Sequence, residues 1–423
     1  MSISTKFDKE PCQIVQELVS HGYEAYIVGG AVRDLLLDAD PKDYDIATSA
    51  TPEEVRVVFG RKHCRIIGRR FRLAHVYFNS IIYEVSTFRR MPTEEERRGR
   101  CSDNGKMIWN DNYYGTLEQD AMRRDFTVNA LYYDVVGPRE VITFSSGMDD
   151  LYQKVVRVIG DPYVRFEEDP VRMLRAMKLC GQYKFELGPK VEHAIAKLGN
   201  KIQLVSTSRL FEELLKIVQC KKTLAILEAC RKYQFLKYFW PLLDECWDEA
   251  EGKLLYKLLS LRCQHVAKGD YSTSKALGMA TVCLPFVMSG LNPKNISGFW
   301  KRSSETDALI NKIIRVVFEQ FNVPRMFTVR IREMVHLVPV LLGRPLSKRA
   351  LDHTEYKYGR ALVELLVEAY GWNKKLITDL PEAEEHPHYT RPKRNYNRSR
   401  KFSGSKKPEM SNKASIKESM NGG

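Results

Sequence analysis

The stretch that decides the fold reads Val28-Gly-Gly-Ala-Val-Arg-Asp-Leu-Leu-Leu and is followed closely by Lys42-Asp-Tyr-Asp-Ile. An apolar strand is predicted over residues 25–28, and helical spacing resumes over 31–37, so Gly29 and Gly30 lie between a strand and a helix. Glycine has no Cβ atom, and its backbone N–H can therefore approach a phosphate at a helix N-terminus. Most Gly-Gly pairs are only turns, so a nucleotide site is indicated only together with neighbouring residues.

Two carboxylates follow this turn. Asp43 and Asp45 are two positions apart, and on a strand both side chains would point to one face, about 7 Å apart along the chain. Carboxylates held side by side repel each other unless cations lie between them, and this spacing suits two Mg²⁺ ions about 3.5–4 Å apart. The alternative is that one Asp caps the next turn while the other is merely exposed. The preceding glycines and Arg33 favour the metal interpretation.

A second polar motif reads Arg123-Arg-Asp-Phe-Thr-Val-Asn-Ala-Leu. Arg123 and Arg124 can clamp phosphates, Asp125 can supply a third carboxylate, and Asn129 can donate to or accept from a ribose hydroxyl. If the segment is helical, Asp125 and Asn129 share a face. An ordinary helix start with an ion pair is the alternative, and Glu84, on an apolar strand, is a rival for the third carboxylate.

Positive charge is concentrated in two places. Residues 56–72 hold seven Lys or Arg and no acid, interleaved with apolar residues, which predicts a strand pair or a strand and turn with guanidinium groups on one face. Arg69, Arg70 and Arg72 are the candidate RNA contacts there, against the alternative of a solvated charged face. Residues 391–423 carry a net charge of +8 out of the chain's +14 and almost no aliphatic residue, so we expect a disordered arm suited to a polyanion such as RNA, or a solubilising tail.

The hydrophobic pattern changes along the chain. The first third alternates predicted strands and helices, including a capped helix that begins at Thr51-Pro52 and reaches about Phe59, and paired strands over 73–78 and 81–88. Residues 89–115 read as a long polar loop of the kind that is usually functional or disordered. After about Asp161 apolar residues recur at helical spacing. The sequence thus predicts an α/β head, an all-helical C-terminal body and a disordered basic tail.

The composition excludes several classes of protein. Hydrophobic residues make up 43% and charged residues 28% of the 423 residues, values that are typical of a soluble globular chain. Apolar runs meet a charge well before the roughly 18 residues that a membrane span needs, and residues 1–10 do not resemble a secretory signal. The nine cysteines form no Cys-x-x-Cys, which excludes a zinc ribbon and argues against a disulfide scaffold. We therefore expect reduced thiols and a cytoplasmic location.

The motifs together resemble the class II nucleotidyltransferases, the family shared by tRNA CCA-adding enzymes and bacterial poly(A) polymerases. The glycine turn with Asp43 and Asp45 matches the metal motif, and the motif at Arg123 matches ribose recognition. Ile159-Gly-Asp-Pro-Tyr-Val-Arg-Phe, leading into Glu168-Asp-Pro-Val-Arg-Met-Leu-Arg, matches base recognition. The resemblance implies a palm-like head that transfers a nucleoside monophosphate from an NTP to an RNA 3′ hydroxyl. Asp43 and Asp45 would hold two Mg²⁺ ions, and Asp125 would be the third acid.

The resemblance also implies a division of the chain. We expect a catalytic head over 10–160, a base-recognition neck over 161–240, a helical and RNA-binding body over 241–380, and a basic disordered tail over 381–423. Protein partners and oligomeric state do not follow from the sequence.

Asp169 and Arg172 form the expected base site, and Arg175 ends the same motif. An Asp acceptor beside an Arg donor suits adenine and cytosine but rejects uracil and guanine, so this pair cannot separate ATP from CTP. Without the surrounding motif, an intrahelical salt bridge would be the default interpretation.

The choice of nucleotide is indicated by other features. Residues 66–76 resemble the segment that distinguishes bacterial poly(A) polymerases from CCA-adding enzymes, and the basic tail is similar to theirs. Both favour template-independent addition of AMP from ATP to RNA 3′ ends. The alternatives are a CCA-adding tRNA nucleotidyltransferase and a catalytically idle RNA-binding protein, and the intact Asp43 and Asp45 argue against the latter.

Overall fold

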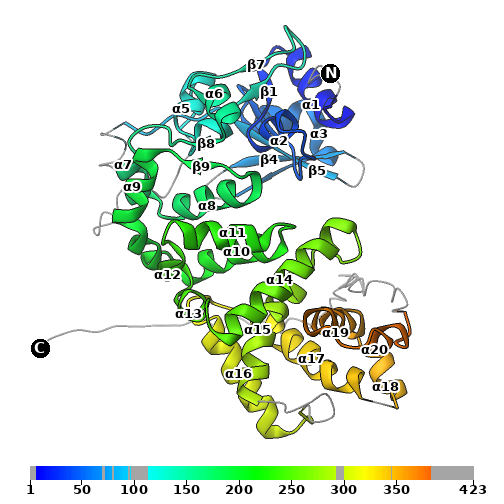
Figure 1. Ribbon diagram of the computed structural model, residues 1–423. Coiled ribbons are helices and arrows are strands. Elements are labelled where there is room, and N and C mark those ends of the chain that lie inside the picture. The colour runs from blue at the N-terminus through cyan, green and yellow to red at the C-terminus, as the bar shows by residue number, and fades with distance from the viewer. Residues whose placement is uncertain are drawn as a thin grey trace, which may run out of the picture. The chain divides into compact units, whose positions relative to one another are not determined.

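The computed structural model of the chain describes residues 6–68, 72–78, 81–93, 96, 113–291, 300–343 and 345–382 (Figure 1). Residues up to Pro381 belong to one compact unit. Most of the expected basic tail, the interior of the expected loop at 89–115, and both Arg69 and Arg70 lie outside the described residues. The two ends of that loop are joined, because Arg89 and Tyr114 form an antiparallel bridge.

A seven-stranded sheet with the order β3-β4-β5-β2-β1-β6-β7 forms the N-terminal part (Figure 1). β2 pairs antiparallel with β1 on one side and parallel with β5 on the other. The remaining neighbours pair antiparallel. The strands are β1 (Ala25–Val28), β2 (Asp45–Thr48), β3 (Cys64–Ile67), β4 (Leu73–Phe78), β5 (Ile81–Thr87), β6 (Tyr132–Tyr133) and β7 (Val141–Ile142).

Three helices accompany the first strands. α1 (Lys9–Ser20) buries one apolar face, and α2 (Gly30–Leu36) follows β1 directly. α3 (Pro52–His63) begins at a capping box in which Thr51 and Glu54 bond to each other's backbone N–H groups. The continuous helix ends near Phe59, as predicted, because Gly60 at φ +74° and ψ 156° is not helical. Beyond this kink a short helical segment reaches His63 before β3. The predicted strand pair in the basic segment is formed by β3 and β4.

Short elements connect the sheet to the helical part. They are α5 (Leu117–Met122), the 3₁₀ helix η2 (Thr127–Asn129), α6 (Gly147–Gln153) and β8 (Val155–Val156). β8 pairs in parallel with β9 (Glu186–Leu187), so one strand lies within the part that we expected to be purely helical. This correction is small: two residues after the left-handed Lys184 extend and pair, too few to give a strand pattern in the sequence.

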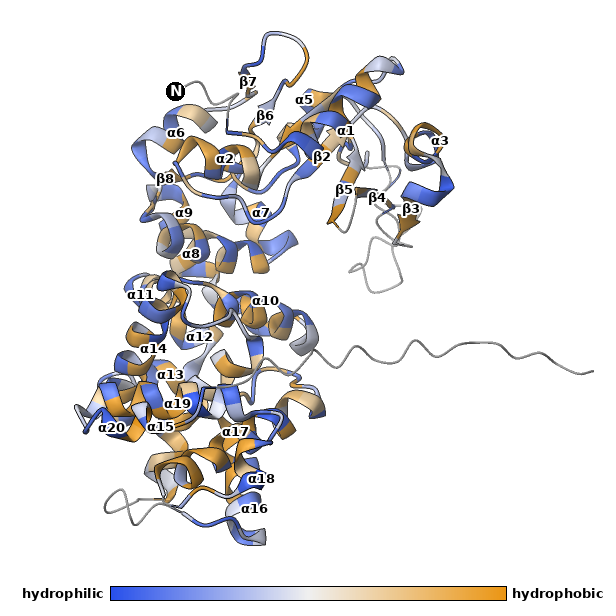
Figure 2. Cartoon of the chain, turned by 90° about the vertical axis from the view of Figure 1, so that its right-hand side faces the viewer, coloured by the Kyte–Doolittle hydropathy of each residue, from blue (hydrophilic) through white to orange (hydrophobic). Residues whose placement is uncertain are grey.

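In the described residues beyond Asp161, every regular element apart from β9 is a helix. α15 is buried along most of its length although Pro285 lies inside it, and Figure 2 shows apolar residues on the helices around it. No described helix is both long and apolar enough to cross a membrane. The helices are α7 (Pro162–Glu168), α8 (Val171–Tyr183), α9 (Pro189–Leu198), η3 (Gly199–Leu204), α10 (Thr207–Gln219), α11 (Thr223–Lys232), α12 (Leu236–Phe239), α13 (Pro241–Glu245), α14 (Ala250–Lys268), α15 (Lys275–Leu291), α16 (Ser304–Val317), α17 (Arg325–Leu342), α18 (Lys348–Leu351), α19 (Tyr356–Tyr370) and α20 (Lys375–Thr378).

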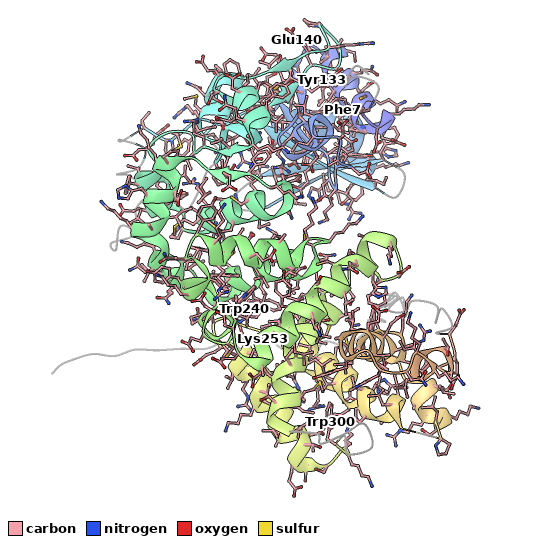
Figure 3. All side chains as sticks on the ribbon, in the orientation of Figure 1. Phe7, Tyr133, Glu140, Trp240, Lys253 and Trp300 are labelled. Atoms are coloured by element: carbon pink, nitrogen blue, oxygen red, sulfur yellow. The ribbon has the colours of Figure 1, made fainter. Side chains whose placement is uncertain are left out.

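Aromatic side chains hold the middle of the helical part together. Trp240, labelled in Figure 3, is 1% exposed and donates its indole N–H to the Val317 carbonyl at 2.7 Å. Its ring lies 5.6 Å from that of Phe318 and 5.3 Å from that of Phe321. A buried Trp with its N–H satisfied contributes apolar area without a polar penalty.

α8 and α11 approach each other closely at Gly181. A Cβ atom added there would lie 2.5 Å from the Ile226 Cα, so only glycine allows this packing distance. The contact fixes the position of α8, which carries Arg172 and Arg175.

We predict that Gly181→Ala lowers the free energy of unfolding by about 1–3 kcal/mol, because the new methyl group collides with backbone that cannot rotate away. Urea unfolding followed by circular dichroism measures this. Glu192→Ala, on the exposed face of α9, is the control and should change stability by less than about 0.5 kcal/mol. Equal stabilities of the two variants would contradict the close approach.

Candidate active site

Asp45 is the first residue of β2 and lies in register with Glu84 on the parallel strand β5. Residues paired in this way point to the same face of a sheet, so the two carboxylates are neighbours. Asp43 precedes the strand and is exposed. The expected strand over 43–47 is therefore wrong at its start. The Asp pair is formed by a strand residue and a residue of the turn before it.

The charges of this group are poorly compensated. The pKa of Asp45 is raised, first because surrounding protein atoms desolvate its carboxylate and then because Glu84 and Asp43 repel its negative charge, while Arg124 opposes the shift. Asp45 nevertheless remains accessible to solvent. Among the described residues, Glu84 has a distant partner in His75 and Asp43 has one in Lys42, each at 3.6 Å. Carboxylate oxygens are the ligands that Mg²⁺ prefers, so Asp43, Asp45 and Glu84 fit a divalent cation by their chemistry.

Of the two glycines of the turn, Gly29 plays a different part from the one expected. The N–H of Gly29 donates to the Leu131 carbonyl at 2.9 Å and is not available to a phosphate. Gly29 has φ +76°, and a Cβ atom there would lie 3.4 Å from Arg124 Nη1. The positive φ and the limited space explain the glycine. Gly30 begins α2.

Arg33 connects three elements of the site. Its guanidinium donates to Asp34 Oδ1 at 2.6 and 2.9 Å, to Asn129 Oδ1 at 2.5 Å and to the Tyr183 hydroxyl at 2.9 Å. It also lies 4.5 Å from the centre of the Tyr183 ring. Burial raises the pKa of Tyr183 to about 12, so its hydroxyl stays neutral. Arg33 thereby joins α2 to η2 and α8.

Asp125 and Asn129 line a cavity of about 280 Å³ next to Arg33. They meet at a turn and a 3₁₀ helix rather than on an α-helix, and Asn129 Nδ2 donates to Asp125 Oδ1 at 3.1 Å. Asp125 Oδ2 lies 3.4 Å from Arg175 Nη1. The cavity is lined by Arg33, Asp125, Asn129, Arg175, Lys178, Leu179, Gln182, Glu213 and Lys216.

The two candidates for the third carboxylate therefore occupy different places. Glu84 is paired in register with Asp45, whereas Asp125 is held by Asn129 and Arg175 in the cavity. Four basic and two acidic residues line that cavity, and this excess of positive charge suits a polyphosphate.

The two arginines of the second motif differ in environment. Arg124 donates to Asp120 Oδ2 and to the Tyr132 hydroxyl, both at 2.9 Å, and these partners raise its pKa although burial opposes the shift. Arg123 is half-buried and lies 3.7 Å from Asp120. Arg124 is thus held by partners within the protein. Both arginines line a second cavity of about 180 Å³, next to Arg89.

The side chains of the expected base-recognition residues do not bond to each other, although the backbone N–H of Arg172 donates to the Asp169 carbonyl at 3.1 Å. Asp169 lies between α7 and α8 and accepts from Arg209 Nη2 at 2.8 Å, while Arg172 donates to the Arg165 carbonyl at 2.7 Å and to Glu168 at 3.1 Å. The intrahelical Asp169–Arg172 salt bridge is therefore absent, and both side chains lie at the start of α8. Arg209, on α10, was missed from the sequence because it is 40 positions away.

Of the candidate RNA contacts, only Arg72 is described, and it forms an ion pair with Glu53 on α3. Arg65, on β3, lies 5.6 Å from the centre of the Tyr77 ring. The basic segment thus places cationic groups on the β3–β4 pair.

Comparisons with known proteins agree with this arrangement. Residues 25–157 match the poly A polymerase head domain, and residues 184–246 match the probable RNA and SrmB-binding site of polymerase A. Poly(A) polymerase I of Haemophilus influenzae is 35% identical over 86% of this chain and 82% of that protein. The CCA-adding enzyme of Lactobacillus helveticus is 31% identical over 80% of both proteins.

Solved structures confirm the predicted fold class. The Bacillus stearothermophilus CCA-adding enzyme in complex with CTP matches with a TM-score of 0.58 at 23% identity, over 87% of this chain and 82% of that one. A tRNA nucleotidyltransferase with a primer tRNA and an incoming ATP analogue matches with a TM-score of 0.55 at 23% identity, over 86% and 96%. The chain is therefore a member of the class II RNA nucleotidyltransferase family, which contains the bacterial poly(A) polymerases and the CCA-adding enzymes.

Proposed function

We propose that this nucleotidyltransferase adds AMP from ATP to RNA 3′ ends without a template. The observation that carries the proposal is the register of Asp45 with Glu84, which places two carboxylates that repel each other on one face of the sheet. The 35% identity to a poly(A) polymerase I over most of both chains supports adenylate addition. CCA addition is the second candidate, supported by the CCA-adding relatives.

In this mechanism the RNA 3′ oxygen attacks the α-phosphate in line, and pyrophosphate leaves. Asp43 and Asp45, with Glu84 beside them, would hold two Mg²⁺ ions, which supply charge neutralisation and a lowered pKa for the attacking hydroxyl. Arg33, Arg175 and the lysines of the cavity would bind the charged part of the nucleotide, and Asn129 would contact its ribose. Asp125 would orient Asn129 and Arg175. The chain positions its substrates and needs no nucleophile of its own.

We further propose that the division into head, neck, body and tail follows the ranges 10–160, 161–240, 241–380 and 381–423. The family match over 25–157 supports the first boundary. Asp169 and Arg172 would then read the base at the start of α8, with Arg209 holding Asp169 in place. Arg69, Arg70 and Arg72 remain proposed contacts for RNA phosphates.

We predict that the purified chain with Mg²⁺ extends a generic RNA by long tails from ATP alone. Labelled ATP, CTP, GTP and UTP, singly and mixed, are offered with that RNA and with a tRNA lacking its CCA end. Synthesis that stops after C, C and A on the tRNA would establish the second candidate instead. No incorporation on either RNA would contradict both.

We predict that Asp45→Asn abolishes incorporation, with a loss of at least about 1,000-fold, and leaves RNA retention on a gel unchanged. The same change should raise the melting temperature in metal-free buffer at neutral pH. The raised pKa of Asp45 means that its ionised form opposes folding, and this penalty disappears only as the pH falls through the raised pKa. Asp40→Asn, an exposed carboxylate nearby, is the matched control and should change neither quantity. Near wild-type activity of Asp45→Asn would overturn the metal assignment.

Glu84→Gln and Asp125→Asn should have different kinetic effects. We predict that Glu84→Gln lowers kcat and raises the Mg²⁺ concentration needed for half-maximal activity, because Glu84 lies beside Asp45. Asp125→Asn should mainly raise the KM for ATP, because Asp125 lies in the cavity and orients Asn129. Steady-state kinetics at varied Mg²⁺ and ATP measure both. An altered Mg²⁺ requirement in Asp125→Asn alone would make Asp125 the third metal ligand.

A further inference from the structure

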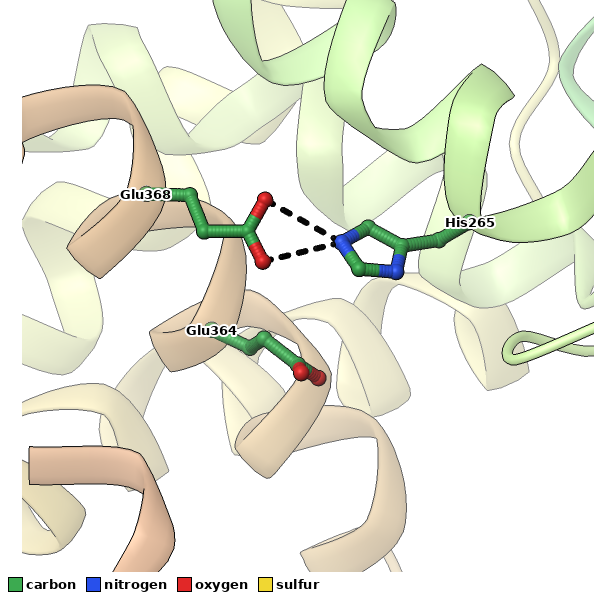
Figure 4. Close-up of side chains that lie close together, drawn as sticks. All are labelled: His265, Glu364 and Glu368. Carbon is green, nitrogen blue, oxygen red and sulfur yellow. Dashed lines mark hydrogen bonds and ion pairs between the residues drawn. The ribbon is translucent and has the colours of Figure 1, made fainter. Parts of the chain in front are cut away.

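A second group of potential metal ligands lies in the helical part and shares no residue with the proposed catalytic site. His265 projects from α14, and Glu364 and Glu368 project from α19, four positions apart and hence on one face of that helix (Figure 4). One ligand atom from each residue lies within 4.8 Å of the other two. The three residues therefore offer one nitrogen and two carboxylate groups around a common point.

The imidazole ring is aimed at this point by two other residues. Nδ1 of His265 lies 2.9 Å from Asp270 Oδ2, and the ring stacks on Tyr271 with centroids 4.6 Å apart and planes 18° apart. Asp270 accepts a hydrogen bond from Nδ1–H, which leaves the Nε2 lone pair facing Glu368. Metal-ligating histidines typically donate their other ring N–H to a carboxylate in this way.

The contacts of His265 Nε2 require either a proton or a metal ion at this nitrogen. Nε2 lies 3.1 and 3.2 Å from the two oxygens of Glu368, and in the neutral ring with Nδ1 protonated these are repulsive contacts between lone pairs. Either a second proton on the ring or a metal ion relieves the repulsion. Burial lowers the pKa of His265, but Asp270 and Glu368 more than offset this, and the net shift is upward.

Glu364 is oriented as well, and the charges around the group favour an ion of higher charge than a proton. The Tyr271 hydroxyl donates to Glu364 Oε2 at 2.8 Å, and burial with the nearby Glu364 raises the Tyr271 pKa, so the hydroxyl stays a donor. Three carboxylates, those of Asp270, Glu364 and Glu368, surround one imidazole. Arg360 lies one turn before Glu364 in α19, and its positive charge acts to lower the pKa of Tyr271. Even a protonated His265 leaves an excess of negative charge between the two helices.

We propose that His265, Glu364 and Glu368 bind one divalent transition-metal ion of the zinc type. One imidazole nitrogen and two carboxylates are a ligand set that zinc accepts, and the half-buried position leaves a fourth place for water. Asp270 and Tyr271 hold the ligands without touching the ion. The ion joins α14 to α19, whose ligand residues are 99 and 103 positions apart in the chain, and so cross-links two helices that are distant in the sequence.

The test is a calorimetric titration of the full chain with Zn²⁺ in excess Mg²⁺, which saturates sites made of hard oxygen ligands alone. The wild type should bind about one ion more than His265→Gln, Glu364→Gln or Glu368→Gln, or bind it at least about tenfold more tightly. Asp270→Asn should still bind the ion, but with a zinc affinity about 10- to 100-fold lower than that of the wild type. The nine cysteines are common to all these proteins, so the difference between them reports this site.

His353→Gln is the matched control, because His353 is also half-exposed and faces one carboxylate, that of Glu333, at 3.5 Å. His353→Gln should bind zinc as the wild type does. Zinc should raise the melting temperatures of the wild type and of His353→Gln, but not those of the variants at His265, Glu364 and Glu368. Because Glu368 is exposed, Glu368→Gln should fold, and it can test the proposal even if His265→Gln does not fold. Equal zinc binding by wild type and Glu368→Gln would overturn the proposal. The proposal would also be overturned if zinc left the melting temperature unchanged and the melting temperature fell as the pH rose through the raised pKa of His265. In that case the group would be a salt bridge between a protonated His265 and its carboxylates.

Discussion

The position of β2 between β1 and β5 is the constraint on which the site depends. β2 has an antiparallel neighbour on one side and a parallel neighbour on the other, and this mixed pairing brings the start of β2 level with Glu84 in the middle of β5. Strand register changes only in whole residues, and a slip by one residue would turn Asp45 to the opposite face. Ile46 and Ala47, which follow Asp45, point to opposite faces and are both buried. A slip by one residue would exchange a large and a small side chain between two packed faces, which opposes it.

The cavity next to Arg33, where we propose that the nucleotide binds, depends on a second set of contacts, between the sheet region and α8. Arg33 bonds to Asn129 and Tyr183, and Arg175 lies beside Asp125, so the two ends of α8 each contact the sheet region through a charged group. Hydrogen bonds to a buried guanidinium are directional and costly to break. The cavity wall is consequently set by the same contacts that join α8 to α2 and η2.

Residues close together in the sequence were predicted well. The strand at Ala25–Val28 and the capped helix after Thr51 follow from local apolar spacing and capping chemistry, and the structure contains both. The fold class also followed from motif order. The N–H of Gly29 was expected to approach a phosphate, but it donates to the carbonyl of Leu131, a residue about a hundred positions away. From the sequence, Glu84 was only a rival to Asp125, since strand order decides which acid stands beside Asp45.

The remaining errors share one physical cause. Arg209 bonds to Asp169, and His265 meets Glu364 and Glu368, only because helices distant in the chain pack against each other. Periodicity identifies the buried face of each helix, but it does not say which helix covers that face. Polar residues at such contacts look like ordinary surface charges in the sequence. Their function depends on a partner that the fold supplies.

Gly181 illustrates how packing far from the chemistry sets the geometry of the proposed base site. Asp169 and Arg172 stand at the start of α8, and Gly181 lies near its end, against the backbone of α11. A helix is stiff over this length, so a displacement at Gly181 moves or tilts the residues at the other end. Discrimination between bases rests on hydrogen-bond distances, which tolerate only small errors before desolvated polar groups are left unpaired. Nucleotide choice at the proposed base site would therefore depend on the position of α8 relative to α10 and α11 as much as on the two side chains that would touch the base.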